Sequence, residues 1–145
     1  MGLDMYLNAR QFSSKDYFRP ELYNTLVKAA PFALDTATLE VNVAYWRKSN
    51  QIHAWFVKHV QGGKDDCREY SVSRDQLQLL IDTCKIVLMQ KEEAVNLLPT
   101  QEGFFFGSYE YNEYYFGDLQ DTIDQLERVL KEFPKEWDFI YSSSW

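Results

Sequence analysis

The chain has 145 residues, enough for one globular domain with its own hydrophobic core, so we expect a single domain over residues 1–145. Hydrophobic residues make up 46% of it and charged residues 26%, with 6 Gly and 4 Pro, which excludes disordered, collagen-like and coiled-coil chains. No apolar run approaches the roughly 20 residues of a membrane-spanning helix, and the N-terminus has no targeting pattern. We therefore expect a soluble, cytoplasmic protein that makes no membrane contact. Two cysteines are too few for a disulfide framework.

Charge is distributed unevenly along the chain. Residues 1–91 contain 12 Lys or Arg and 10 Asp or Glu, whereas residues 92–145 contain 3 and 12. A formal net charge of −7 and an isoelectric point near 4.8 argue against binding to extended nucleic acid, which needs a basic surface. A local pocket of Arg, His and helix N-termini can still hold a small anion. The acidic part is either a solvated surface or a contact for a basic protein.

Alternating and helical patterns of apolar residues predict the elements of the N-terminal half. Leu3, Met5, Leu7 and Ala9 alternate with polar residues, as in a strand with one buried face. A Pro in the first turn favours a helix after residue 19, and a Gly pair at 62–63 ends a later one. In chain order we predict a strand at 2–10, a helix at 20–30, a strand at 37–45 and a helix at 46–60.

The C-terminal half begins with a short strand at 68–73 and a helix that Ser73 caps, with Gln76 completing a capping box. Cys84 falls on the apolar stripe of this helix and is expected in the core. Residues 92–110 form a long connection, followed by a helix over about 111–133 and a strand at 137–145. The whole order predicts an α+β fold: an antiparallel or mixed sheet of four to five strands with three to four helices packed mainly on one face.

The segment YWRKSNQIHAWFVKHV is the most informative part of the sequence. On a helical wheel, Asn50 and His53 fall within the apolar stripe, whereas Gln51 and Trp55 fall on the opposite, more exposed side. Buried polar groups need partners, so two interpretations stay open. Either Asn50 and His53 satisfy backbone groups of the neighbouring sheet and fix how the helix docks, or they line a cleft beside a bound ligand. In the second case Arg47 donates to an anionic group of that ligand.

The segment GFFFGSYEYNEYYF concentrates eight aromatic residues within positions 104–116. Aromatic faces stack on nucleobases, and a helix N-terminus can hold a phosphate. The alternative is that these rings fill a small core and a subunit interface. We expect ligand contacts from Tyr45, Arg47, Asn50, His53, Arg68, Phe104, Phe105, Phe106 and Ser108. We expect interface contacts from Trp55, Tyr114 and Tyr115, because exposed aromatic residues are enriched at interfaces.

Standard catalytic and cofactor motifs are missing from the sequence. It has no GxSxG, HExxH, GxGxxG or P-loop pattern. His53 and His59 lie six residues apart on different helix faces, and the acidic pair Asp65 and Asp66 stands in a polar turn, so we expect no metal site. We assign no catalytic residue and expect no cofactor.

MGLDMYL at the start, YWRKSNQIHAWFV in the middle, LLPTQEGFFFGSYEYNEYYFGDL and the terminal YSSSW together resemble a family of small uncharacterised phage, prophage and bacterial proteins. The resemblance covers most of the chain. It implies an accessory factor against host defence, acting in the host cytoplasm, of the kind that includes sponges for cyclic-nucleotide or NAD-derived immune signals. It brings no established activity.

Three functions follow as hypotheses. The first is a homo-oligomeric, non-enzymatic protein that sequesters a small nucleotide-like signal. The second is an inhibitor whose acidic last helix, with Asp121, Asp124 and Glu127, occupies the basic surface of a host protein. The third is a metal-independent nucleotide hydrolase built around His53.

Overall fold

The computed structural model describes residues 2–31, 34–103 and 105–145, and in them four strands form one antiparallel sheet of order β2-β1-β4-β3. The strands are β1 (Asp4–Ser14), β2 (Thr36–Arg47), β3 (Tyr70–Val72) and β4 (Asp138–Ser144). The helices are α1 (Pro20–Ala29), α2 (Asn50–His59), α3 (Arg74–Met89), α4 (Ala94–Leu97) and α5 (Glu113–Glu132), with a 3-10 turn at Lys91–Glu93. The predicted α+β class is confirmed, with the sheet antiparallel throughout.

One face of the sheet carries the hydrophobic core, because side chains alternate between the two faces of a strand. Leu3, Met5, Leu7 and Ala9 are all fully buried, as the alternation predicts. Two rings of the inner face make contact with helices. Tyr141 of β4 stacks on Phe56 of α2, with ring centroids 3.9 Å apart, and Trp46 of β2 donates its indole N–H to Thr122 of α5 at 2.9 Å.

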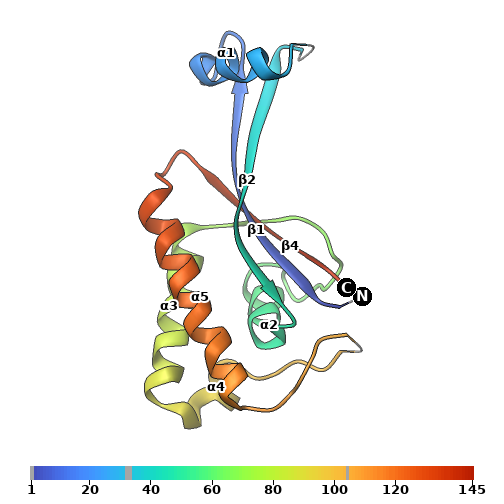
Figure 1. Cartoon of the computed structure of the whole chain (residues 1–145), viewed down its shortest axis with the longest axis vertical. Helices are drawn as coiled ribbons and strands as arrows, with labels where there is room; N and C mark the ends of the chain where they lie inside the picture. The colour runs from blue at the N-terminus through green and yellow to red at the C-terminus, as the bar shows by residue number, and fades with distance from the viewer. Residues whose placement is uncertain (1, 32–33, 104) are drawn as a thin grey trace.

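Helices α3 and α5 lie side by side along the body of the molecule (Figure 1). Each presents its apolar stripe inward, and Cys84 of α3 is fully buried as expected. The capping box at the start of α3 is formed: Ser73 Oγ accepts from the Gln76 N–H at 3.0 Å, and Gln76 Oε1 accepts from the Ser73 N–H at 2.9 Å. These contacts fix the pair of helices on which α2 and the sheet rest.

The outer halves of β1 and β2 extend beyond the body as a two-stranded ribbon that carries α1 at its end (Figure 1). Strand β4 pairs with β1 only as far as Arg10, whereas β2 continues to Ser14. We call the described residues of 11–39 the arm. Arg19, at the start of α1, donates to the carbonyl of Glu136 at 2.8 Å and so ties the arm to the turn before β4.

Element boundaries differ from the predictions mainly around α2 and in the long connection. Strand β2 continues to Arg47, and α2 begins at Asn50 instead of residue 46. The cause is tertiary, because Trp46 faces the core as a strand residue and bonds to α5. The connection over residues 92–110 contains α4, a single turn of helix.

Candidate functional site

A cavity of about 630 Å³ opens between α2, the loop that follows it, and the connection after α4. This volume lies within the range of small-molecule sites, roughly 300–1,000 Å³. Its walls are formed by Gln51, His53, Ala54, Trp55, Val57, Lys58, His59, Gly62, Gly63, Asp65, Asn96, Leu97, Leu98, Pro99 and Gln101. We call it the α2 cavity.

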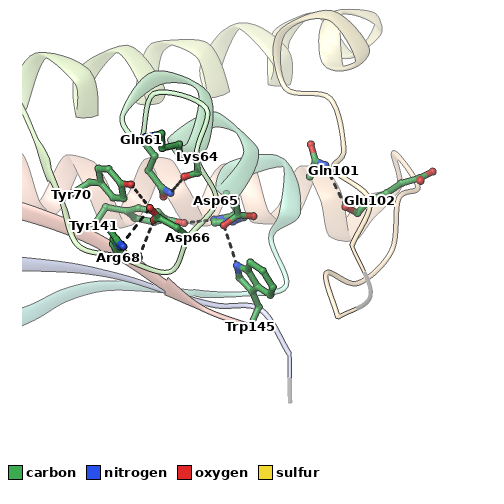
Figure 2. Close-up of polar contacts among 11 residues, drawn as sticks. Gln61, Lys64, Asp65, Asp66, Arg68, Tyr70, Gln101, Glu102, Tyr141 and Trp145 are labelled. Carbon is green, nitrogen blue, oxygen red and sulfur yellow. Dashed lines mark hydrogen bonds and ion pairs between the residues drawn. The ribbon is translucent and has the colours of Figure 1, made fainter.

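The loop after α2 places a carboxylate against this helix. Gly62 and Gly63 both have positive φ, 61° and 83°, a backbone conformation that residues with a side chain rarely adopt. They reverse the chain so that Asp65 returns to the side of α2. Figure 2 shows Asp65 turned toward Trp145, and its carboxylate accepts a hydrogen bond of 3.0 Å from the indole N–H of Trp145. Asp66 turns instead toward Arg68 and Tyr70.

His53 is a buried polar residue in the wall of the cavity. Its ring is fully buried, with Nδ1 2.7 Å from the Tyr141 hydroxyl. Nε2 lies 3.0 Å from Asp65 Oδ1, close enough for electrostatic attraction but without the alignment of a hydrogen bond. Burial lowers the pKa of His53, and Asp65 opposes that effect only in part. The ring is therefore neutral near pH 7, with Nδ1 accepting from Tyr141 and Nε2 carrying the proton toward Asp65.

This arrangement leaves His53 without a ring nitrogen directed at a bound molecule. A general base must reach the proton that it removes, and both nitrogens of His53 face groups of the protein itself. The lining of the α2 cavity contains no Ser, Thr, Tyr or Cys side chain, so it offers no hydroxyl or thiol nucleophile.

Trp55 and His59 form an aromatic pair in the cavity wall, with ring centroids 4.7 Å apart and planes at 27°. Neither the Trp55 indole N–H, the His59 ring nor the Lys58 ammonium makes a hydrogen bond to another described residue. Burial lowers the pKa of His59, and the neighbouring charge of Lys58 lowers it further. The cavity therefore has donors available beside aromatic rings, and its lining also includes the apolar residues Leu97 and Pro99.

Asn50 has all its hydrogen-bonding capacity engaged by backbone groups. Its amide nitrogen donates to the carbonyls of Phe106 at 3.0 Å and Ser108 at 2.9 Å, and its oxygen accepts from the Gln101 N–H at 2.9 Å. The structural interpretation placed the partners of Asn50 in the neighbouring sheet, whereas they lie in the connection after α4. Asn50 fastens the connection over 101–108 to the start of α2.

Two of the expected ligand contacts, Tyr45 and Arg47, lie at the C-terminal end of β2, outside the α2 cavity. Arg47 forms an ion pair with Asp4 at 2.9 Å, and the Tyr45 hydroxyl also donates to Asp4. The ion pair and the two hydrogen bonds hold the pKa of Asp4 below its usual value. Arg47 and Ser108 line a second, smaller cavity of about 290 Å³, next to Lys48 and Asp118.

The described aromatic residues between positions 104 and 116 are divided between the core and the surface. Phe106 is 6% exposed and meets His53 edge to face with ring centroids 5.5 Å apart. Gly103 makes this fold possible, because a Cβ there would come within 2.5 Å of the Phe106 ring. Phe105 is half-buried and its carbonyl accepts from the Leu3 N–H at 3.2 Å. Phe104 lies outside the described residues.

Arg68, the remaining ligand candidate, is exposed on the loop between α2 and β3, where its Nε lies 3.8 Å from Asp66. The described residues among the predicted ligand contacts lie at several places, and of these only His53 lines the α2 cavity.

The expected exposure of Trp55 and Gln51 is wrong. Trp55 is 4% exposed and Gln51 is 3% exposed, because the chain around α4 and after it covers the side of α2 that a helical wheel assigns to solvent. Tyr115 is also buried, and its hydroxyl donates to the carbonyl of Leu98 at 2.6 Å. Tyr114 is 74% exposed and stays available for a protein contact.

Several lining residues had no signal of their own in the sequence. Leu97 and Pro99 come from the irregular connection, which follows no periodic pattern, and Asp65 reads as part of a solvated turn. Lys58 and His59 were expected on the exposed side of the helix, where they are. Only the covering of α2 by the connection turns that side into a cavity wall.

Comparisons with known proteins add no relative: no family model, curated protein or solved structure matches the chain. Within residues 2–31, 34–103 and 105–145, no three His, Cys, Asp or Glu side chains gather as a metal site would need. No helix of that same part is long and apolar enough to span a membrane.

Proposed function

We propose that the protein binds a small nucleotide-like molecule in the α2 cavity and holds it without converting it. The observation that carries this proposal is the lining itself, a stacked Trp55–His59 pair beside unpaired donors. A planar base stacks favourably on an exposed aromatic ring, by about 1–3 kcal/mol per base in other proteins. Here that ring is His59, because Trp55 is only 4% exposed and supports His59 from behind. Lys58 supplies a positive charge for a phosphate in a chain whose formal net charge is −7.

Sequestration is favoured over hydrolysis by the closed arrangement around His53. Its ring nitrogens face Tyr141 and Asp65, and no hydroxyl or thiol lines the cavity. A hydrolase built around His53 would need one of its ring nitrogens to face the ligand. The resemblance to phage and prophage proteins supplies a setting for the proposal, in which the ligand is a cyclic-nucleotide or NAD-derived immune signal in the host cytoplasm.

A thermal-shift panel tests the proposal, using mononucleotides, cyclic di- and trinucleotides, and ADP-ribose derivatives. A ligand at about 100 times its dissociation constant adds roughly 2.7 kcal/mol of stability, which raises Tm by several degrees for a domain of this size. We expect one class to raise Tm and to be recovered intact by mass spectrometry. A converted ligand would identify an enzyme and contradict the proposal.

Matched variants locate the binding. Leu97→Arg places a long charged side chain in the cavity wall and should abolish the shift, whereas Leu79→Arg, on an exposed position of α3, should leave it unchanged. Lys58→Ala should weaken binding of a phosphate-bearing ligand more than Lys131→Ala. A flat panel, or a shift that survives Leu97→Arg, would overturn the α2 cavity as the site. A flat panel would favour a protein partner for the acidic surface of α5.

A further inference from the structure

The arm is a two-stranded ribbon, and such a ribbon is marginally stable in water by itself. Past Arg10 only β1 and β2 pair, since β4 ends its ladder there. Helix α1 contacts both strands, and Tyr23 is its buried residue. A third strand along the ribbon would therefore stabilise the arm.

The outer edge of β2 is free where the arm leaves the body. Strand β2 stands at the end of the sheet, and no described residue pairs with its outer edge over residues 36–43. Farther along, Gln125 of α5 covers the edge, accepting from the Tyr45 N–H at 2.9 Å and donating to the Tyr45 carbonyl at 3.0 Å. The chain therefore protects one end of this edge and leaves eight residues of it open.

Apart from a bulge at Val43, at its inner end, that open edge lacks the devices that usually prevent strand pairing. Its sequence, TATLEVNV, contains no Pro and no Lys, and its one charge is Glu40. Glu40 is paired with Arg10, whose guanidinium lies 2.8 Å from it and 3.0 Å from Glu69. Threonine and branched apolar residues favour strands, so the segment is well suited to pairing.

Apolar side chains on the arm also lack cover. Ala37 and Leu39 lie on the inner face of β2 and remain partly exposed. At the end of the arm, Tyr17 is 93% exposed, Leu34 84%, Phe18 48% and Phe12 44%. A cluster of this kind on a projecting element marks a protein contact.

We propose that the arm joins two copies of this chain, with β2 of one copy pairing antiparallel to β2 of the other across a twofold axis. A second copy fits because the edge is complementary to itself, and because an antiparallel partner brings each arm end to the body of the other copy. Directly opposed residues of an antiparallel pair point to the same face of the sheet. The twofold axis must therefore lie between two copies of the same residue, one from each chain. An axis at Glu40 would oppose two carboxylates, whereas an axis at Leu39 opposes two leucines.

The register at Leu39 makes a sharp experiment possible. Opposed Cα atoms in an antiparallel pair are about 4.5–5.5 Å apart, within the range that a disulfide spans. In a Cys67→Ser background, Leu39→Cys should form a reducible dimer on oxidation. Met89→Cys, an exposed position on α3, serves as the control and should remain monomeric on a non-reducing gel.

Sedimentation equilibrium of the unmodified chain should show a dimer at micromolar concentration. Leu39→Lys, which opposes two ammonium groups at the axis, should shift it to monomer, while Ile86→Lys on α3 should not. Circular dichroism checks that both variants fold. A monomer at high micromolar concentration, or a dimer that Leu39→Cys fails to cross-link, would overturn the proposal. This test does not depend on ligand binding, so its result does not decide the ligand-binding proposal.

Discussion

His53 and Tyr141 join α2 to the last strand by one buried hydrogen bond of 2.7 Å. Burial raises the pKa of Tyr141 well above its usual value, so its hydroxyl keeps its proton and donates it to Nδ1. Removing that hydroxyl leaves a buried acceptor without a partner, which is more costly than the loss of an exposed hydrogen bond.

Tyr141→Phe should therefore lower the free energy of unfolding by about 1–3 kcal/mol. Urea denaturation measures this change. Tyr70→Phe is the matched control, since its hydroxyl bonds to Asp66 at the surface, and it should have little effect. Equal effects of the two substitutions would show that the His53 bond contributes nothing particular to stability.

The lowered pKa of His53 makes stability depend on pH. Because the pKa in the folded state lies below the ordinary value of 6.5, the unfolded chain takes up a proton first as pH falls. The stability that the neutral His53 ring contributes is complete above about pH 6.5 and is lost as the pH falls toward the pKa of His53 in the folded state. His59 acts in the same direction, whereas the lowered pKa values of Asp4 and Asp66 act only below their ordinary 3.8.

We expect the free energy of unfolding to be level above pH 7 and to fall as the pH is lowered below about 6.5. Urea unfolding at several pH values checks this. The slope should be smaller in His53→Gln than in His59→Gln, because His53 is fully buried and His59 is exposed. A slope unchanged by His53→Gln would assign the dependence to another group.

At the scale of elements, Asn50 is the contact that holds the irregular connection against α2. Its three hydrogen bonds to Gln101, Phe106 and Ser108 replace the regular ladder that this segment lacks. The segment also forms part of the α2 cavity through Gln101, so its attachment affects both stability and the shape of the site.

Asn50→Ala should cost about 3 kcal/mol, since each hydrogen bond contributes about 1 kcal/mol. Hydrogen exchange should speed up selectively in residues 101–108. Asn96→Ala removes one weak surface contact of 3.4 Å and should change neither measurement. Uniform faster exchange over the whole chain would indicate global destabilisation instead of local release.

At the scale of the whole molecule, acidic charge is concentrated in the C-terminal part that contains α5. Asp121 and Asp124 are exposed there, and each accepts only from a Gln of the same helix. Repulsion among such charges acts against the compact state and is screened by salt.

Raising the salt concentration from about 10 mM to about 150 mM shortens the screening length from roughly 30 Å to roughly 8 Å. Stability of the folded chain should rise as a result, measured as Tm in sodium chloride. A double variant, Asp121→Lys with Asp124→Lys, changes the net charge by +4 from −7 and should show a smaller rise. A Tm that falls with salt would mean that attractive ion pairs outweigh the repulsion.

The sequence by itself determined the four strands, the four longer helices and their order, but neither α4 nor the start and the buried sides of α2. Alternation identified the four residues at the start as a buried face, and the capping box at Ser73 and the apolar stripe through Cys84 were correct, because these signals depend only on local geometry. Local patterns do not report what covers a helix from outside. The burial of Trp55 and Gln51, the return of Asp65 to His53, and the α2 cavity were decided by the tertiary structure alone, since they depend on where a loop without periodicity comes to rest.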